Sequence, residues 1–170
     1  MSISYGEYSF TFKGGITKIK YMSGKDIYSD SPESGILFTY IHKDRYLVDL
    51  ECGSFTIPKY YEFWNGTCFD FNLMVFNAFI DIGRVFKSEK GFSSISAGYN
   101  IGPTTAQKGN VLFEFGNSWR ILFTKGYKST HVLGEDVFLC FDAGAEFGAY
   151  TRYFVQIGVG ITDLFNESGS

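Results

Sequence analysis

The chain has 170 residues and a net charge of -3 at pH 7, with 19 Phe, 12 Tyr and 20 Gly but only 3 Pro. This length suits one domain, residues 1–170, with a sizeable core. The scattered Lys and Arg residues argue against nucleic acid as a partner, because nucleic-acid binders carry a basic stripe. Phe and Tyr favour pleated strands and glycine lets strands bend closely, so the composition predicts an all-β protein.

Two hydrophobic signals are missing from the sequence. No run of about 18 apolar residues occurs, so no transmembrane helix is predicted, although alternating strands would escape such a search. The N-terminus, Met1–Glu7, has neither the basic nor the apolar region of a signal peptide. We therefore expect either a cytosolic chain or a mature domain from which a signal peptide has been removed.

Alternation of apolar and polar residues predicts about nine strand segments. In chain order they are 8–13 (resuming at 19–21), 36–40, 46–57, 69–75, 78–83, 94–102, 111–124, 137–148 and 153–165. Residues 22–34, 58–66 and 125–136 are expected to be loops.

Changes in the parity of the apolar positions predict interruptions in these segments. Gly14-Gly15 indicates a bulge or a turn, Gly53-Ser54 a bulge, and Phe76-Asn77 a reversal of the chain. Gly116-Asn117 fits either a position within a long strand or a hairpin turn.

The last segment of the chain, Val137–Phe165, shows the alternation most clearly. Its odd positions are apolar, whereas its even positions are mostly small, polar or charged, with Asp142, Glu146 and Gln156 among them. A strand that crosses a bilayer needs about 9–11 residues of this pattern, and the segment supplies two such runs. It favours a membrane barrel.

The run Tyr153–Phe165 resembles the terminal strand of small bacterial outer-membrane β-barrels, the eight-stranded OmpA-, OmpX- and OmpW-like proteins. In that class a final Phe after alternating apolar residues resembles the signal read by the barrel-assembly machinery, although this chain continues through Asn166–Ser170. The resemblance implies a single antiparallel up-and-down β-barrel of eight strands, in the bacterial outer membrane. Ten strands would follow if Gly14-Gly15 is a turn.

In a membrane barrel the polar face of the strands lines the lumen. The expected polar network of the lumen is Asp49, Glu51, Asp70, Asp81, Glu114, Arg120, Asp142, Glu146 and Gln156. Because these residues include one Arg among many carboxylates, and buried charges need partners, we expect Lys13, Lys18 or Arg152 also to turn inward, or water to enter.

No catalytic residue is predicted, and we expect no enzymatic activity. His42 and His131 both fall in expected loops, and only His131 with Ser129 and Glu135 could imitate a lipid-modifying site at the rim of a barrel. Cys52, Cys68 and Cys140 lack Cys-x-x-Cys spacing, so no metal or cofactor is expected, and a bridge between Cys52 and Cys68 is left open.

The leading hypothesis is a monomeric outer-membrane barrel that contacts the lipid bilayer. Its loops would bind a host or surface ligand, as an adhesin does, or its lumen would pass small solutes. The alternative is a soluble, lipocalin-like barrel that binds an apolar ligand in an aromatic-lined cavity. The direction of the side chains separates the two: Asp142 and Glu146 inside with Phe141 and Phe147 outside indicates a membrane barrel.

Overall fold

The computed structural model describes residues 7–21, 29–43, 45–64, 67–102, 105–108, 111–114, 117–132, 135–148 and 150–162. Side chains are described for residues 7–19, 31–43, 45–56, 74–102, 117–130, 136–148 and 151–162. The strands in this part of the chain are β1 Glu7–Tyr21, β2 Ser29–His42, β3 Tyr46–Trp64, β4 Thr67–Ser88, β5 Gly91–Asn100, β6 Thr105–Lys108, β7 Val111–Glu114, β8 Trp119–Val132, β9 Glu135–Phe147 and β10 Tyr150–Thr162.

Eight of these strands form a closed antiparallel barrel. The order β3-β2-β1-β10-β9-β8-β5-β4 is closed by pairing of β3 with β4, so each barrel strand pairs with its neighbours along the chain and β10 returns to β1. The remaining two strands, β6 and β7, form a hairpin that pairs with β4. The prediction of an all-β, up-and-down barrel of eight strands is therefore confirmed.

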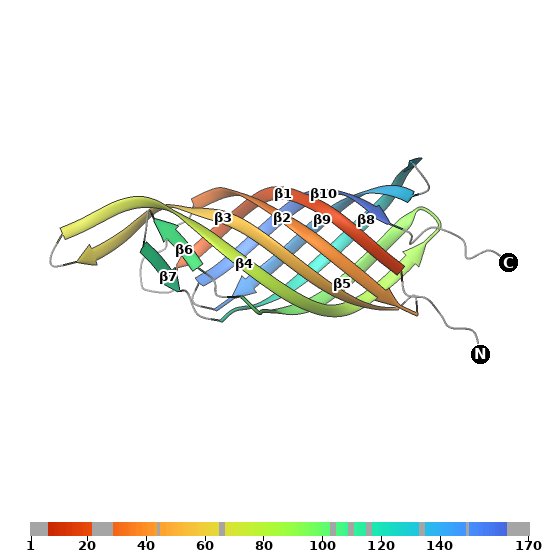
Figure 1. The fold of residues 1–170 in the computed structure, drawn as a ribbon, viewed down its shortest axis with the longest axis horizontal. Helices are drawn as coiled ribbons and strands as arrows, with labels where there is room; N and C mark the ends of the chain where they lie inside the picture. The colour runs from red at the N-terminus through yellow and green to blue at the C-terminus, as the bar shows by residue number, and fades with distance from the viewer. Residues whose placement is uncertain are drawn as a thin grey trace.

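The two ends of the barrel differ (Figure 1). The start of β1 and the end of β10 lie at one end of the barrel, where short segments join β2 to β3, β4 to β5 and β8 to β9; we call this the terminus end. At the opposite end, the loop end, the β3–β4 hairpin extends past the other strands and the β6–β7 hairpin lies beside it. Small outer-membrane barrels show the same asymmetry of short turns and long loops.

Three predicted interruptions of the strands are wrong. β1 pairs with β2 and β10 without a register shift at Gly14-Gly15. β3 passes Gly53-Ser54 in register, and its shift lies between Ile57 and Tyr60 instead. β4 runs straight through Phe76-Asn77.

Gly15 has a packing role rather than a turning role. A Cβ on this residue would lie 2.7 Å from the Cα of Gln156 on the neighbouring strand, so the glycine permits a close approach of two backbones.

Parts of all three predicted loops are strand. β2 begins at Ser29, inside the expected loop 22–34, of which residues 22–28 lie outside the described residues. β3 continues to Trp64, within the expected loop 58–66, and Trp64 pairs with Thr67 of β4. β8 continues to Val132 and β9 begins at Glu135, so most of 125–136 is a hairpin. The expected strand 111–124 is divided between β7 and β8.

Candidate functional site

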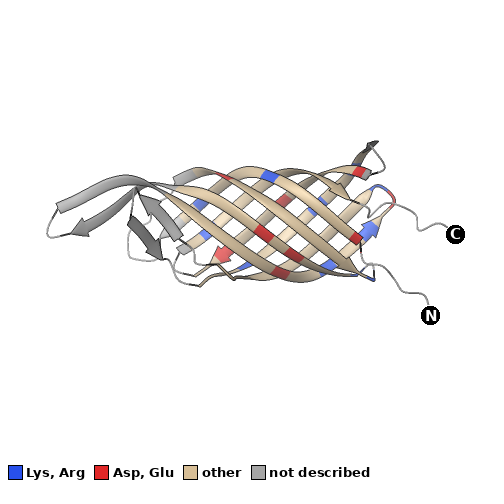
Figure 2. Cartoon of the chain, in the orientation of Figure 1, with Lys and Arg blue, Asp and Glu red and all other residues tan. Residues whose placement is uncertain are grey.

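The inward face of the barrel is polar and the outward face apolar. On β9 and β10, Asp142, Glu146 and Gln156 are at most 3% exposed, whereas Phe141 is 46% exposed and Phe147 is half-buried. The same alternation gives every barrel strand outward apolar residues, among them Phe12, Ile36, Leu50, Ile82, Ile95, Phe123, Leu139 and Ile157. Charged positions recur along the middle of the barrel wall (Figure 2).

Arg120 on β8 crosses the lumen to β4 and β3. Its Nε donates to Asp81 Oδ1 at 2.8 Å and its Nη2 donates to Asp81 Oδ2 at 2.5 Å, while Nη2 also lies 2.9 Å from Glu51 Oε2. The guanidinium carbon lies 4.2 Å from the centre of the Phe79 ring. Arg120 is thus held by two carboxylates and an aromatic face, as a buried guanidinium needs.

Arg152 on β10 forms a second ion-pair centre. Its Nη1 donates to Glu33 Oε2 at 2.6 Å and its Nε donates to Glu146 Oε2 at 2.8 Å. The guanidinium carbon lies 4.5 Å from the centre of the Phe55 ring and 4.6 Å from that of Phe154. Glu33 was not predicted here, because the surrounding Ser, Asp and Pro residues indicated a loop.

Lys13 on β1 connects the ion pairs of Arg120 to β9. Its Nζ forms ion pairs with Glu51, at 3.4 Å, and with Asp142. Lys13 and Arg152 therefore turn inward, as charge balance led us to expect, whereas Lys18 is exposed on the outer face.

Asp49 also lies in the lumen, 3% exposed, and accepts a hydrogen bond of 2.5 Å from Thr39 Oγ1. Among the described residues, the buried lumen thus contains three cations and six carboxylates near its middle. The cations are Lys13, Arg120 and Arg152, and the carboxylates are Glu33, Asp49, Glu51, Asp81, Asp142 and Glu146.

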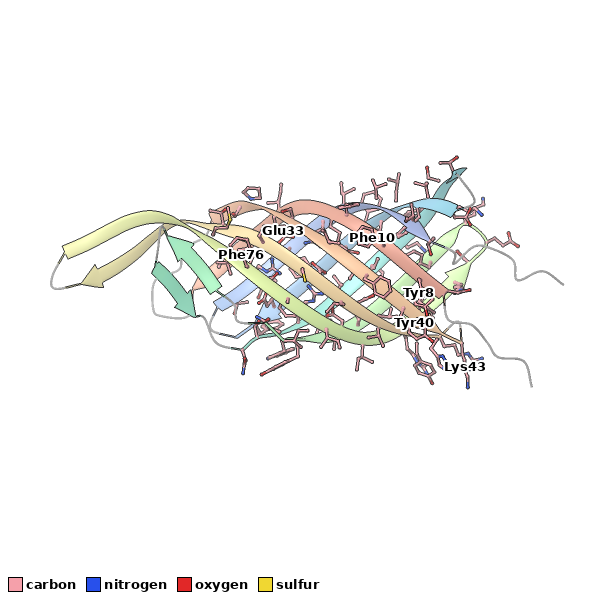
Figure 3. All side chains as sticks on the ribbon, in the orientation of Figure 1. Tyr8, Phe10, Glu33, Tyr40, Lys43 and Phe76 are labelled. Carbon is pink, nitrogen blue, oxygen red and sulfur yellow. The ribbon has the colours of Figure 1, made fainter. Side chains whose placement is uncertain are left out.

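Toward the terminus end the lumen becomes apolar. Ile41, Leu47, Val85, Phe92, Phe138 and Cys140 form one buried cluster. Outside the barrel at this end, Tyr8 and Tyr40 lie with ring centres 5.2 Å apart, and Arg84 lies over Tyr46. Figure 3 shows Tyr8 and Tyr40 together, with Lys43 near the same end and Glu33 and Phe76 farther toward the loop end. Aromatic residues with polar tips are typical of a bilayer interface.

Two residues of the expected network lie outside the closed ring of strands. Asp70 pairs with Tyr61 in the extended part of the β3–β4 hairpin, and Glu114 pairs with Thr105 in the β6–β7 hairpin. Their side chains are outside the described residues, as is that of His131, whose backbone lies in β8. His42 is exposed at the end of β2.

The described residues contain neither a cluster of His, Cys, Asp or Glu side chains that could hold a metal ion nor a membrane-spanning helix. Cys52 is an exposed free thiol whose register partner on β4 is Ala78. Cys68 lies about ten residues before Ala78 on β4, opposite Phe63. At the rise of a β-strand the two cysteines are therefore roughly 30 Å apart, far beyond the reach of a disulfide. In this part of the chain no three His, Cys, Asp or Glu side chains are grouped to hold a metal ion. No helix there is long and apolar enough to span a membrane.

Comparisons with known proteins gave matches of structure only. No protein-family model and no curated protein sequence matched the chain. The crystal structure of Neisserial surface protein A matches with a TM-score of 0.65 and 8% identity, over 91% of this chain and 96% of that one.

A second similar structure is that of Ail, the attachment invasion locus protein of Yersinia pestis, solved in complex with the heparin analogue sucrose octasulfate. It matches with a TM-score of 0.51 and 13% identity, over 92% of this chain and 98% of that one. At such identities the likeness establishes a shared fold, and the expected resemblance to small outer-membrane barrels is confirmed at that level.

Proposed function

We propose that this protein is an integral β-barrel of the bacterial outer membrane with a closed lumen, and that it binds a surface ligand through the hairpins of its loop end. The observation that carries the proposal is the direction of the side chains. Charged residues of the lumen are buried, while Ile16, Ile82 and Ile157 are more than half exposed on the outer wall. An apolar outer wall of this extent needs a lipid environment.

The filled lumen favours a binding protein over a channel. Ion pairs cross the middle of the barrel, and the apolar cluster around Phe92 and Phe138 blocks the terminus end. The alternative of a soluble barrel that binds an apolar ligand is not favoured either. Most of the exposed large apolar residues lie on the outer wall, whereas the middle of the interior is charged.

The composition of the loop end suggests the kind of ligand. The connecting segments 20–30, 57–73 and 101–116 contain ten aromatic residues but only four Lys and five Asp or Glu. Nearly neutral, aromatic segments suit recognition by ring contacts rather than binding of a polyanion, which needs a basic surface. We therefore expect weaker retention on heparin than a basic adhesin would show.

Extraction and gel mobility test the membrane proposal. The folded chain should require detergent for extraction, and heating should change its gel mobility. A chain that purifies as a monomer without detergent contradicts the proposal. Firm retention on heparin at physiological salt would contradict the ligand class while leaving the membrane assignment intact.

A further inference from the structure

Asp49 differs from the other carboxylates of the lumen. Glu51, Asp81, Asp142, Glu33 and Glu146 each form an ion pair with a buried Lys or Arg. For Asp49 the described residues provide no Lys or Arg within ion-pair distance, and its hydrogen bond comes from the neutral hydroxyl of Thr39. Its cross-strand neighbour is another carboxylate, Asp81. An unpaired charge at such a buried position is strongly unfavourable.

A small cavity lies beside this carboxylate. The cavity has a volume of about 20 Å³, and Asp49 is among the residues that line it. This volume accommodates about one water-sized guest. Five residues that carry a hydroxyl, Ser9, Thr11, Thr39, Ser94 and Thr124, line the same cavity, and all five are buried.

These groups have the chemistry of a site for a small, hard cation. One carboxylate and several hydroxyl oxygens are ligands that alkali cations accept, and the one soft donor in the lining, the Cys140 thiol, is not a ligand that such hard cations prefer. One carboxylate balances one positive charge, so the set suits a monovalent ion better than a divalent ion. We propose that the cavity beside Asp49 binds a single monovalent cation of about the size of Na⁺, held by the Asp49 carboxylate and the surrounding hydroxyls.

The position of the cavity determines how the ion exchanges. The apolar residues Leu47, Val85, Phe92 and Phe138 line the side of the cavity toward the terminus end, and the ion pairs of Lys13 and Arg120 lie toward the middle of the barrel. The cation is therefore enclosed when the barrel closes and leaves when it opens, so binding stabilises the folded state by mass action.

Equilibrium unfolding of the full chain in a zwitterionic detergent tests the site. The urea midpoint is measured at fixed ionic strength in NaCl, KCl, LiCl and N-methylglucamine chloride. We expect at least one alkali cation to lower the unfolding constant by about tenfold when its concentration is about nine times its dissociation constant. The nearly isosteric variant Asp49→Asn should lose this dependence, and Glu89→Gln, at an exposed turn position, should keep it.

Equal midpoints in all four salts would overturn the proposal, since a bound water or a protonated Asp49 gives no cation dependence. A dependence retained by Asp49→Asn would overturn it as well. If that variant does not fold, wild-type crystals grown in NaCl decide the question. A density peak beside Asp49 whose oxygen neighbours lie closer than hydrogen-bond distance supports the site, and a peak at hydrogen-bond distance, or an empty cavity, rejects it. None of these results depends on which ligand the loops bind.

Discussion

Gly98 lies on β5 directly between Arg120 and Asp81, which are joined by two hydrogen bonds in the lumen. Its register partners are Asp81 on one side and Arg120 on the other, and a Cβ at this position would overlap the Asp81 carboxylate. The glycine therefore leaves the space through which the guanidinium reaches β4.

We predict that Gly98→Ala displaces Asp81 from Arg120 and lowers the free energy of unfolding by about 3–5 kcal/mol, the usual cost of breaking a buried ion pair. The neighbouring residue Ala97 is exposed on the outer wall. Ala97→Val serves as the control and should change the stability by no more than about 0.5 kcal/mol. The urea midpoints of the folded barrels in detergent measure both effects, and equal midpoints for wild type and Gly98→Ala would contradict the role assigned to the glycine.

A double-mutant cycle tests the Arg120–Asp81 pair itself. Arg120→Met leaves the Asp81 carboxylate buried without its cation and should cost about 3–5 kcal/mol. Adding Asp81→Leu should recover a large part of this loss, because replacing both members of a buried pair by apolar groups is often neutral. Glu51 still has Lys13 as a partner in both variants. Additive effects of the two substitutions would show that the pair is not coupled.

The sequence allowed the inward residues of this network to be predicted, but not their partners. Alternation determines the face, and Asp142, Glu146 and Arg120, for which it predicts the inward face, are buried. Arg120, however, meets Asp81 and Glu51 across 39 and 69 residues of sequence, and these residues meet only because β8, β5, β4 and β3 lie side by side in the barrel. Glu33 was missed for a different reason. Pro32 and Ser34 lie on the outer face of β2, and such residues are typical of loops, so residues 22–34 were predicted to be a loop.

At the scale of the strand pair, inward glycines accept inward aromatic rings. Phe138 on β9 pairs with Gly160 on β10, and Phe154 on β10 pairs with Gly144 on β9. A Cβ on Gly160 would lie 2.5 Å from the Phe138 ring. Gly144 and Gly160 therefore leave room for a ring that projects from the neighbouring strand.

We predict that Gly160→Ala forces the Phe138 ring to move and destabilises the barrel by about 1–3 kcal/mol through overpacking. Combining it with Phe138→Leu should cost less than the sum of the two single substitutions, because the smaller side chain makes room for the methyl group. Val159→Ala, on the outer face of the same strand, controls for loss of apolar contact. Thermal midpoints of the four variants decide the question; strict additivity would argue against the packing.

The wrong strand interruptions have a common physical cause. The inward face is polar in the middle of the barrel but becomes apolar toward its ends, where Ile19, Phe55 and Val75 are buried. When the inward residues of a strand change from polar to apolar, the apolar residues in the sequence move from even to odd positions or the reverse. A shift of register by one residue produces the same pattern. Conversely, Lys125 and Lys128 on β8 made a continuous strand resemble a loop. The periodicity of a strand is reliable only where each face keeps one polarity.

At the scale of the whole molecule, the membrane-barrel and soluble-barrel hypotheses differ in what surrounds the outer wall: lipid in the first and water in the second. The outward residues of β10 sample that wall from one end to the other: Tyr153, Val155, Ile157, Val159 and Ile161 are each about half exposed. Their inward neighbours stay in the lumen in either case. Substitutions along this one strand therefore report on the surroundings of the barrel with little change in its interior.

We predict a peaked profile when these five residues are replaced one at a time by Arg. In lipid vesicles Ile157→Arg, near the middle of β10, should lower the free energy of unfolding by about 2–4 kcal/mol, and the variants at the two ends of the strand by about 0–1 kcal/mol. A barrel whose outer wall faces water would give a flat profile within about 0.5 kcal/mol, because an exposed Arg then replaces an exposed apolar residue at little cost. A loss of strand stability that Arg causes at any position lowers the free energy of unfolding of all five variants alike. The position dependence of the profile therefore tests the membrane assignment by itself. A maximum displaced toward either end would place the centre of the bilayer there, and a flat profile would reject the membrane assignment.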